Sequence, residues 1–120
     1  MFRAALLTFL MTTSAVLADE LPIKVPTDPG AEYTLLNVHV EKGAIVQIES
    51  RRNGKSGISH AVRRVDCKKH VSSYIYDEDA RSPKFPVSNS DMNLRPITED
   101  SITWWISKYG CEQAKVGSPW

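Results

Sequence analysis

The hydrophobic periodicity of the chain changes once, and this change most constrains the fold. Between residues 33 and 76, apolar and polar side chains alternate at the period-two spacing of β-strands, for example at Ala44, Val46 and Ile48. After Thr98 the apolar residues follow the spacing of a helix. The apolar stripe of this helix consists of Ile102, Trp105, Ile106 and Tyr109. The sequence therefore predicts an α+β fold, with an antiparallel sheet of three to four or more strands and one C-terminal helix packed on one face.

Turn residues divide the period-two region into separate strands. Glu41-Lys42-Gly43 is typical of a turn, and Asn53-Gly54 predicts a hairpin because both residues tolerate positive φ. Apolar side chains change parity within the following strand, so we expect a bulge near Arg63-Arg64. We expect Thr98 to cap the helix and Gly110 to end it. The predicted strands are residues 33–40, 44–50, 58–67 and 71–76.

The N-terminus has the three parts of a secretory signal peptide. Arg3 gives a short positive region, and Ala4–Leu17 is uncharged but too short for the roughly 20 residues that span a bilayer. Val16-Leu17-Ala18 places small residues where signal peptidase reads, so we expect cleavage after Ala18. We expect no transmembrane segment and a product in the periplasm or outside the cell. The predicted organisation is a signal peptide (1–18), an extended proline-rich arm (19–32) and a single α+β domain (33–120).

The chain contains two cysteines, Cys67 and Cys111. In an exported protein such a pair is most simply a disulfide. The spacing is not that of a Cys-x-x-Cys redox site, and two cysteines alone cannot build a structural zinc site. On the chain-entropy account, this crosslink would stabilise the fold by roughly 4 kcal/mol.

Basic residues are concentrated in one segment, although the net charge of the whole chain is only +1. A hairpin would bring them together into a cationic patch at one edge of the sheet, which could attract an acidic protein or an anionic glycan. The alternative is that they are solvated residues that protect a strand edge from aggregation. Nucleic acid is not expected as a partner, because the segment lacks interleaved aromatic residues. The basic residues are Arg51, Arg52, Lys55, Arg63, Arg64, Lys68 and Lys69.

Trp104 is a second candidate for binding. Adjacent helix positions are 100° apart, so Trp104 and Trp105 cannot share the core stripe, and an outward tryptophan is a favoured interface anchor. The alternative is that the proline-rich loop before the helix covers Trp104. The three histidines, His39, His60 and His70, could converge on a metal, since we expect His39 and His60 to lie on neighbouring strands, but we predict no metal site and no cofactor.

No catalytic constellation is present in the sequence. It lacks a Gly-x-Ser-x-Gly elbow, a phosphate-binding glycine loop and a His-Glu-x-x-His pattern. Ser59-His60 are sequence neighbours, which point to opposite faces of a strand and so cannot form a nucleophile–base pair. The sequence therefore predicts a protein that is not an enzyme.

The C-terminal half resembles the surface-adhesin protein E family of small exported bacterial proteins, over about residues 60–112. The resemblance lies in Val65-Asp66-Cys67-Lys68, in Tyr74-Ile75-Tyr76, and in Ile97–Ser101 before a helix with Cys111. The family's usual Pro-Gly-Ser before the helix is Glu99-Asp100-Ser101 here. The resemblance implies an exported α+β domain with this disulfide, and adhesion to host matrix proteins characterises some members.

These features together predict an exported, non-enzymatic binding protein of the bacterial envelope. It would be adhesin-like and would bind an acidic protein or a polyanionic glycan through the basic hairpin. The alternative is a periplasmic inhibitor or immunity protein that blocks a toxin or a hydrolase.

Overall fold

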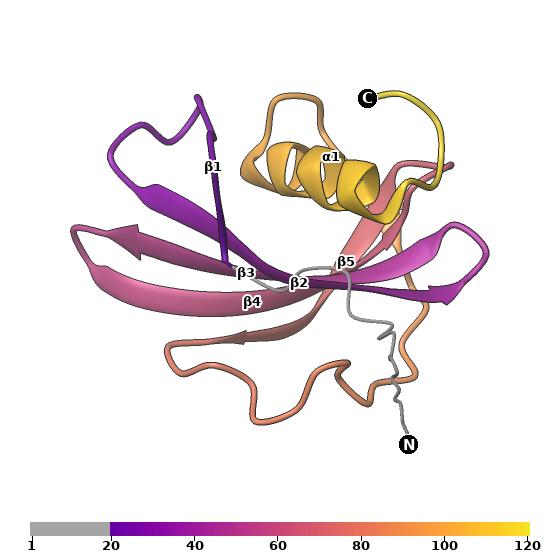
Figure 1. Ribbon diagram of the computed structural model, residues 1–120, viewed down its shortest axis with the longest axis horizontal. Coiled ribbons are helices and arrows are strands. Elements are labelled where there is room, and N and C mark those ends of the chain that lie inside the picture. Colours follow the sequence, from indigo (N-terminus) through magenta and orange to yellow (C-terminus); the bar gives the residue numbers. More distant parts are fainter. Residues whose placement is uncertain (1–19) are drawn as a thin grey trace, which may run out of the picture.

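The computed structural model describes residues 20–120, which form one six-stranded antiparallel sheet and one helix (Figure 1). The strands follow one another across the sheet in sequence order, so every connection joins neighbours. This arrangement confirms the predicted α+β fold with a C-terminal helix. The elements are β1 (Leu21–Ile23), β2 (Glu32–Lys42), β3 (Ile45–Gly54), β4 (Gly57–Asp66), β5 (Val71–Glu78), β6 (Arg95–Pro96) and α1 (Ile102–Ala114).

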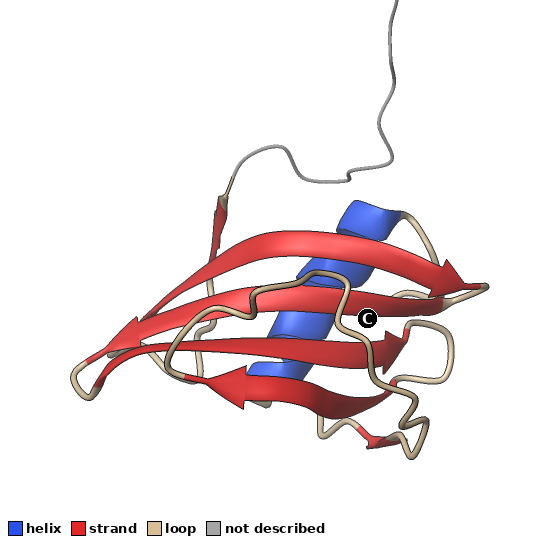
Figure 2. Cartoon of the chain, turned by 90° about the horizontal axis from the view of Figure 1, so that it is seen from below, coloured by secondary structure: helices blue, strands red, loops and turns tan. Residues whose placement is uncertain are grey.

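Both faces of the sheet are covered, each by a different part of the chain. The helix α1 lies across one face, and the loop of residues 79–94 crosses the other (Figures 1 and 2). We call these the helix face and the loop face. On β4, Val65 is buried on the helix face and Val62 on the loop face. The apolar residues of β4 change parity because both faces of the strand are buried. The pairing of β4 with β3 is regular and contains no bulge. An irregularity is nevertheless present beside the expected position: the β4–β5 register shifts between Val62 and Arg63, and the extra residue, Ile75, lies on β5 and not on β4.

The proline-rich segment before β2 contains a strand that the sequence did not predict. Leu21–Ile23 pair antiparallel with Tyr33–Leu35 at the edge of the sheet. Pro22 has no backbone N–H, and it is compatible with this position because the outer side of an edge strand needs no hydrogen bond to a neighbour. The segment is therefore part of the sheet and not only an extended arm.

The hairpin turn between β3 and β4 lies two residues later than predicted. Gly54 pairs with Gly57, so the connecting residues are Lys55 and Ser56, and Asn53 still belongs to β3. Gly57 has φ +115, a conformation that glycine adopts without strain. The turn therefore depends on Gly57 more than on Asn53-Gly54.

The helix begins and ends later than predicted. Its N-cap is Ser101, whose hydroxyl accepts a hydrogen bond from the amide of Trp104, and its C-cap is Lys115 in the left-handed conformation. The predicted cap, Thr98, precedes the helix by a turn. Gly110 lies inside the helix and is buried against Ile48 of β3, because a residue without Cβ allows the helix to approach the sheet closely.

Replacing Gly110 with alanine is expected to destabilise the protein by about 1–2 kcal/mol. An added Cβ would lie 2.4 Å from Cδ1 of Ile48, a β-branched side chain that is fully buried and cannot swing away. The free-energy cost of this overpacking exceeds the gain in helix propensity from glycine to alanine, which is at most about 1 kcal/mol. Urea denaturation measures the change. The control is Gly30→Ala, which meets no atom within 4 Å and is expected to leave stability within about 0.5 kcal/mol; equal stability of the two variants would contradict the close packing.

The disulfide Cys67–Cys111 is present and joins the end of β4 to the last turns of α1. Both cysteines are buried in the hydrophobic core. The C-terminal tail then folds back over this bond, where the amide of Ser118 donates to the carbonyl of Cys67. Among residues 20–120 we find no helix with the length and hydropathy that crossing a bilayer requires.

Candidate functional site

The structure does not gather the basic segment into one patch. Because side chains alternate along a strand, Arg52 and Arg63 lie on the helix face, whereas Arg51 and Arg64 lie on the loop face. Lys55 lies in the β3–β4 turn, and Lys68 and Lys69 follow the opposite end of β4. A strand of 10 residues separates these two ends by about 30 Å. The predicted cationic surface is therefore divided among two faces and two ends of the sheet.

Two of the arginines are paired with acidic residues from the N-terminal segment. Arg51 binds Glu20 at 2.6 Å, and Arg52 binds Asp28 at 2.9 Å. The hydrogen bonds from these guanidinium groups lower the pKa of Glu20 and of Asp28. Both arginines are thus neutralised by the acidic stretch that precedes β2.

Arg64 lies in a polar cluster that fastens the loop of residues 79–94 to the sheet. Its guanidinium binds both oxygens of Glu41 and donates to the backbone carbonyls of Asn89 and Asp91. Its side chain is only 4% exposed. Arg64 is therefore fully used in holding the loop.

The same cluster contains two more buried polar side chains of β3. The side-chain amide of Gln47 donates to the carbonyl of Val87, and its oxygen accepts from the amide of Val87. Glu49 accepts from Arg81 in the loop and from Asn37 on β2. We call this set the loop-face cluster. It consists of Asn37, Glu41, Gln47, Glu49, Arg64 and Arg81.

Arg63 differs from the other arginines because no carboxylate of residues 20–120 lies within salt-bridge distance of it. It is 3% exposed. Its three nitrogens donate to hydroxyl groups, at 3.1 Å to Thr103 of α1, 3.1 Å to Ser50 of β3 and 2.7 Å to Tyr74 of β5. Burial lowers the pKa of Arg63, yet an arginine still keeps its charge. The guanidinium carbon also lies 4.5 Å from the centre of the Tyr74 ring, so every direct partner of this buried cation is neutral, and the charge of Asp77 acts on it only from a distance.

A cleft of about 100 Å³ opens beside Arg63, between α1 and the ends of β3, β4 and β5. We call it the Arg63 cleft. Burial and a hydrogen bond to Asp28 raise the pKa of Tyr33 to about 12, so this phenol stays neutral and can act as a hydrogen-bonding group. The cleft is lined by Tyr33, Ser50, Arg52, Ser59, Ala61, Arg63, Tyr74, Asp77, Ile102 and Ile106.

The chemistry of this cleft is that of an acceptor for an anion. A buried guanidinium without a counter-ion costs several kcal/mol, and an acidic group placed beside it would offset that cost. A guanidinium has five N–H donors. In Arg63, only three of them donate to hydroxyl groups, those of Thr103, Ser50 and Tyr74. Two N–H donors of Arg63 therefore have no acceptor among residues 20–120.

Trp104 belongs to an aromatic cluster around the C-terminal tail. Its ring meets that of Trp105 edge-on at 4.9 Å and that of Trp120 at 6.1 Å. Trp120 in turn stacks on His70 at 3.6 Å. Trp104 is half-buried among these aromatic side chains, whereas the loop of residues 79–94 crosses the opposite face of the sheet (Figure 1).

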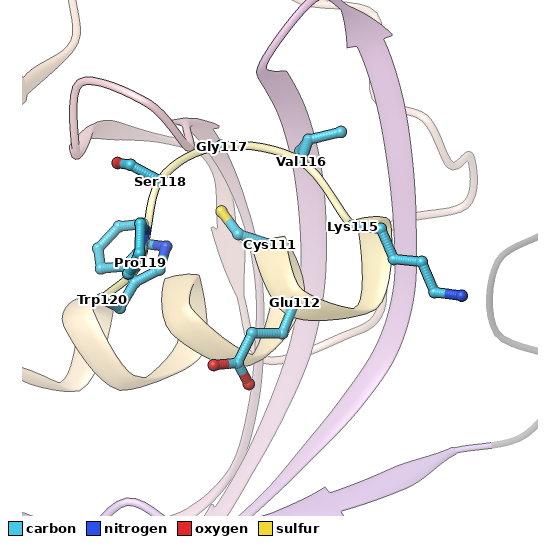
Figure 3. Close-up of a pocket in the computed structure, with 8 residues that line it drawn as sticks. All are labelled: Cys111, Glu112, Lys115, Val116, Gly117, Ser118, Pro119 and Trp120. Atoms are coloured by element: carbon cyan, nitrogen blue, oxygen red, sulfur yellow. The ribbon is translucent and has the colours of Figure 1, made fainter.

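A second hollow, of about 250 Å³, lies between the last turn of α1 and the tail (Figure 3). Figure 3 shows that the side chains of Glu112 and Lys115 point away from the tail. The hollow thus lacks converging polar side chains, and its position over the disulfide indicates a structural role.

The three histidines do not converge. His39 is on β2 and His60 on β4, and β3 separates these strands, so the expectation that they are neighbours was wrong. His60 contacts the carbonyl of Asp79, and His70 contacts Ser118. Within residues 20–120, no group of three potential metal ligands is present.

The sequence identified Arg63 but missed the residues that surround it. Ser50, Tyr74 and Thr103 lie far apart in the chain and come together only when α1 packs on the folded sheet. One feature of the sequence could have indicated the site, because Arg63 has the same strand parity as the core residue Val65 and must therefore point inward. Comparison with known proteins found no matching family model, no similar curated protein and no similar solved structure.

Proposed function

We propose that this chain is an exported, non-enzymatic binding protein that takes one acidic side chain of a protein partner into the Arg63 cleft. The observation that carries this proposal is the buried charge of Arg63, which is 3% exposed and whose direct partners among the described residues are all neutral: three hydroxyls and the ring of Tyr74. A charge-assisted hydrogen bond to a carboxylate is about twice as strong as a neutral one. The cleft is therefore suited to distinguish an acid from its amide.

The dimensions and charge of the cleft favour a protein acid over a polyanionic glycan. A volume of about 100 Å³ can hold one acidic group but not the several charged groups of a polyanionic glycan. Asp77 also borders the cleft, and because its negative charge opposes every added anion, the cleft suits a single acidic group better than a polyanion. The expected ligand is thus a single Asp or Glu flanked by neutral or basic residues.

Export is part of the proposal. The predicted signal peptide, residues 1–18, lies outside the described residues, but the disulfide is typical of proteins in oxidising compartments. The resemblance to the surface-adhesin protein E family stays a prediction. An adhesin-like role and the alternative inhibitor role both require recognition of a partner protein, and the same cleft would serve either.

Selection from a phage-displayed library of random nine-residue peptides tests the acid preference. Protein purified after expression of the full-length chain is expected to enrich peptides that share Asp or Glu at one position. The Arg63→Met variant is expected to lose this preference by at least tenfold. Its melting temperature should stay close to that of the wild type, because the loss of three hydrogen bonds to hydroxyls is offset by removal of the desolvation cost of a buried ion.

The matched control is Arg51→Met, which removes the same charge from the other face of the sheet and should retain the acid preference. Selection of peptides without a common acidic position would overturn the proposal, and so would equal enrichment by the wild type and Arg63→Met. If Arg63→Met did not fold, the wild type alone would decide, by its affinity for a selected peptide and for the same peptide with Gln in place of Glu.

A further inference from the structure

The edge of β5 beyond its first two residues has no partner strand among residues 20–120. β6 pairs only with Val71 and Ser72. The loop after Glu78 then passes under the sheet and does not run along this edge (Figure 2). An unpaired edge presents backbone N–H and C=O groups to which another strand can bind, and proteins commonly protect such edges with proline or lysine. Residues 73–76 contain neither, and their one irregularity is a β-bulge against β4, at Ile75.

Two hollows lie on the helix face, and Tyr74 of β5 borders both. One is the Arg63 cleft, where the hydroxyl of Tyr74 accepts a hydrogen bond from Arg63. The other has a volume of about 230 Å³ and lies between the start of α1 and residues Ser73 and Pro96. Tyr74 itself is 51% exposed. Alternate side chains of an extended peptide point the same way and lie about 7 Å apart, so two of them can enter neighbouring hollows.

We propose that the free edge of β5 binds an extended segment of a partner protein as an added strand. An acidic side chain of this segment enters the Arg63 cleft, and a neutral side chain two residues away enters the second hollow. In strand addition the backbone hydrogen bonds supply affinity, and the pockets for alternate side chains supply specificity. This inference rests on the proposed acid-binding function of the cleft.

Charge complementarity determines the occupant. Arg63 favours an acidic residue at one position of the bound segment. Asp77 and Glu78, at the end of β5, disfavour acidic residues at the positions of the segment that would lie beside them. An added strand with one acid among neutral or basic residues satisfies both conditions.

An N-methyl scan of a peptide selected from the library tests strand addition. Each backbone amide of a synthetic nine-residue consensus peptide is methylated in turn, and affinity is measured by isothermal titration calorimetry. Because alternate amides of an added strand bond to the edge, we expect methylation to weaken binding at least tenfold at every second position and little at the positions between. Hydrogen exchange of β5 amides in residues 73–77 should slow in the complex.

The outcomes separate this inference from the function on which it rests. Uniform effects of methylation, together with a retained preference for Glu over Gln, would overturn strand addition and leave the acid-binding function standing. Loss of the preference for Glu over Gln would overturn both the acid-binding function and the proposed strand addition. Sedimentation is expected to show a monomer; a dimer that the peptide dissociates would assign the edge to a second copy of the chain and would also overturn the proposed occupant.

Discussion

Replacing both cysteines with alanine is expected to lower the free energy of unfolding by about 4 kcal/mol. The bond closes a loop between residues 44 positions apart, and on the chain-entropy account such a crosslink restricts the unfolded chain by about this amount. A domain of this size has a total stability of about 5–15 kcal/mol, so the loss is a large fraction of it. Urea denaturation of the wild type and of the Cys67→Ala/Cys111→Ala variant measures the difference.

The reduced wild-type protein is the matched control for this variant, because it loses the crosslink but keeps both sulfur atoms in the core. Cys67 and Cys111 are both almost completely buried, so a difference between reduced protein and variant reports the cost of the two small cavities. A double variant as stable as the oxidised protein would show that packing of α1 on the sheet is sufficient without the bond.

Glu41→Ala is expected to destabilise the protein by about 3 kcal/mol, the second largest effect. The substitution leaves the guanidinium of Arg64 buried, with only the carbonyls of Asn89 and Asp91 as acceptors. Removing one partner of a buried ion pair costs about 3–5 kcal/mol, and Glu41 is partly accessible, so the lower value applies. Urea denaturation at neutral pH gives the change.

The control for this substitution is Glu112→Ala. It breaks the exposed ion pair with Lys108 on α1 and is expected to cost less than about 0.5 kcal/mol. The double variant Glu41→Leu/Arg64→Met should recover most of the lost stability, because an apolar pair leaves no unpaired buried charge. Equal effects of Glu41→Ala and Glu112→Ala would contradict a special role of the loop-face cluster.

The pH dependence of stability provides a second readout of the Glu41–Arg64 pair. The hydrogen bond from Arg64 lowers the pKa of Glu41 below its ordinary value of 4.5. A carboxyl group whose pKa is lower in the folded state contributes stability that is complete above the unfolded pKa and is lost as the pH falls through the folded one. Stability should therefore fall below about pH 4.5, and Glu41→Ala should make this fall shallower.

Periodicity was sufficient to predict the four central strands and the helix. Alternation persists over the long strands β2 to β5, so the pattern is clear there. It fails for β1, since three residues that include Pro22 carry no recognisable period. The C-terminal limit of α1 was wrong because Gly110 is required by close contact with Ile48 and does not mark the end of the helix. Such contacts arise only when distant segments pack.

The candidate site shows the same limit for polar residues. A run of arginines and lysines in the sequence predicts an exposed cationic surface, yet Arg63 and Arg64 are each 3% exposed. Arg64 is buried because the loop of residues 79–94, which is polar in sequence, covers the sheet through its own carbonyl groups. Partners this far apart in the chain cannot be identified from local sequence.

The most direct test of the acid-binding account is the NMR signal of the Arg63 side chain. The Nε–H of a buried, hydrogen-bonded arginine gives a slowly exchanging resonance, and its absence from the spectrum of Arg63→Met assigns it. We predict that a selected peptide containing Glu shifts this resonance and that the same peptide with Gln shifts it far less. A resonance that does not move while the Glu peptide binds would contradict the assignment of the Arg63 cleft as the site.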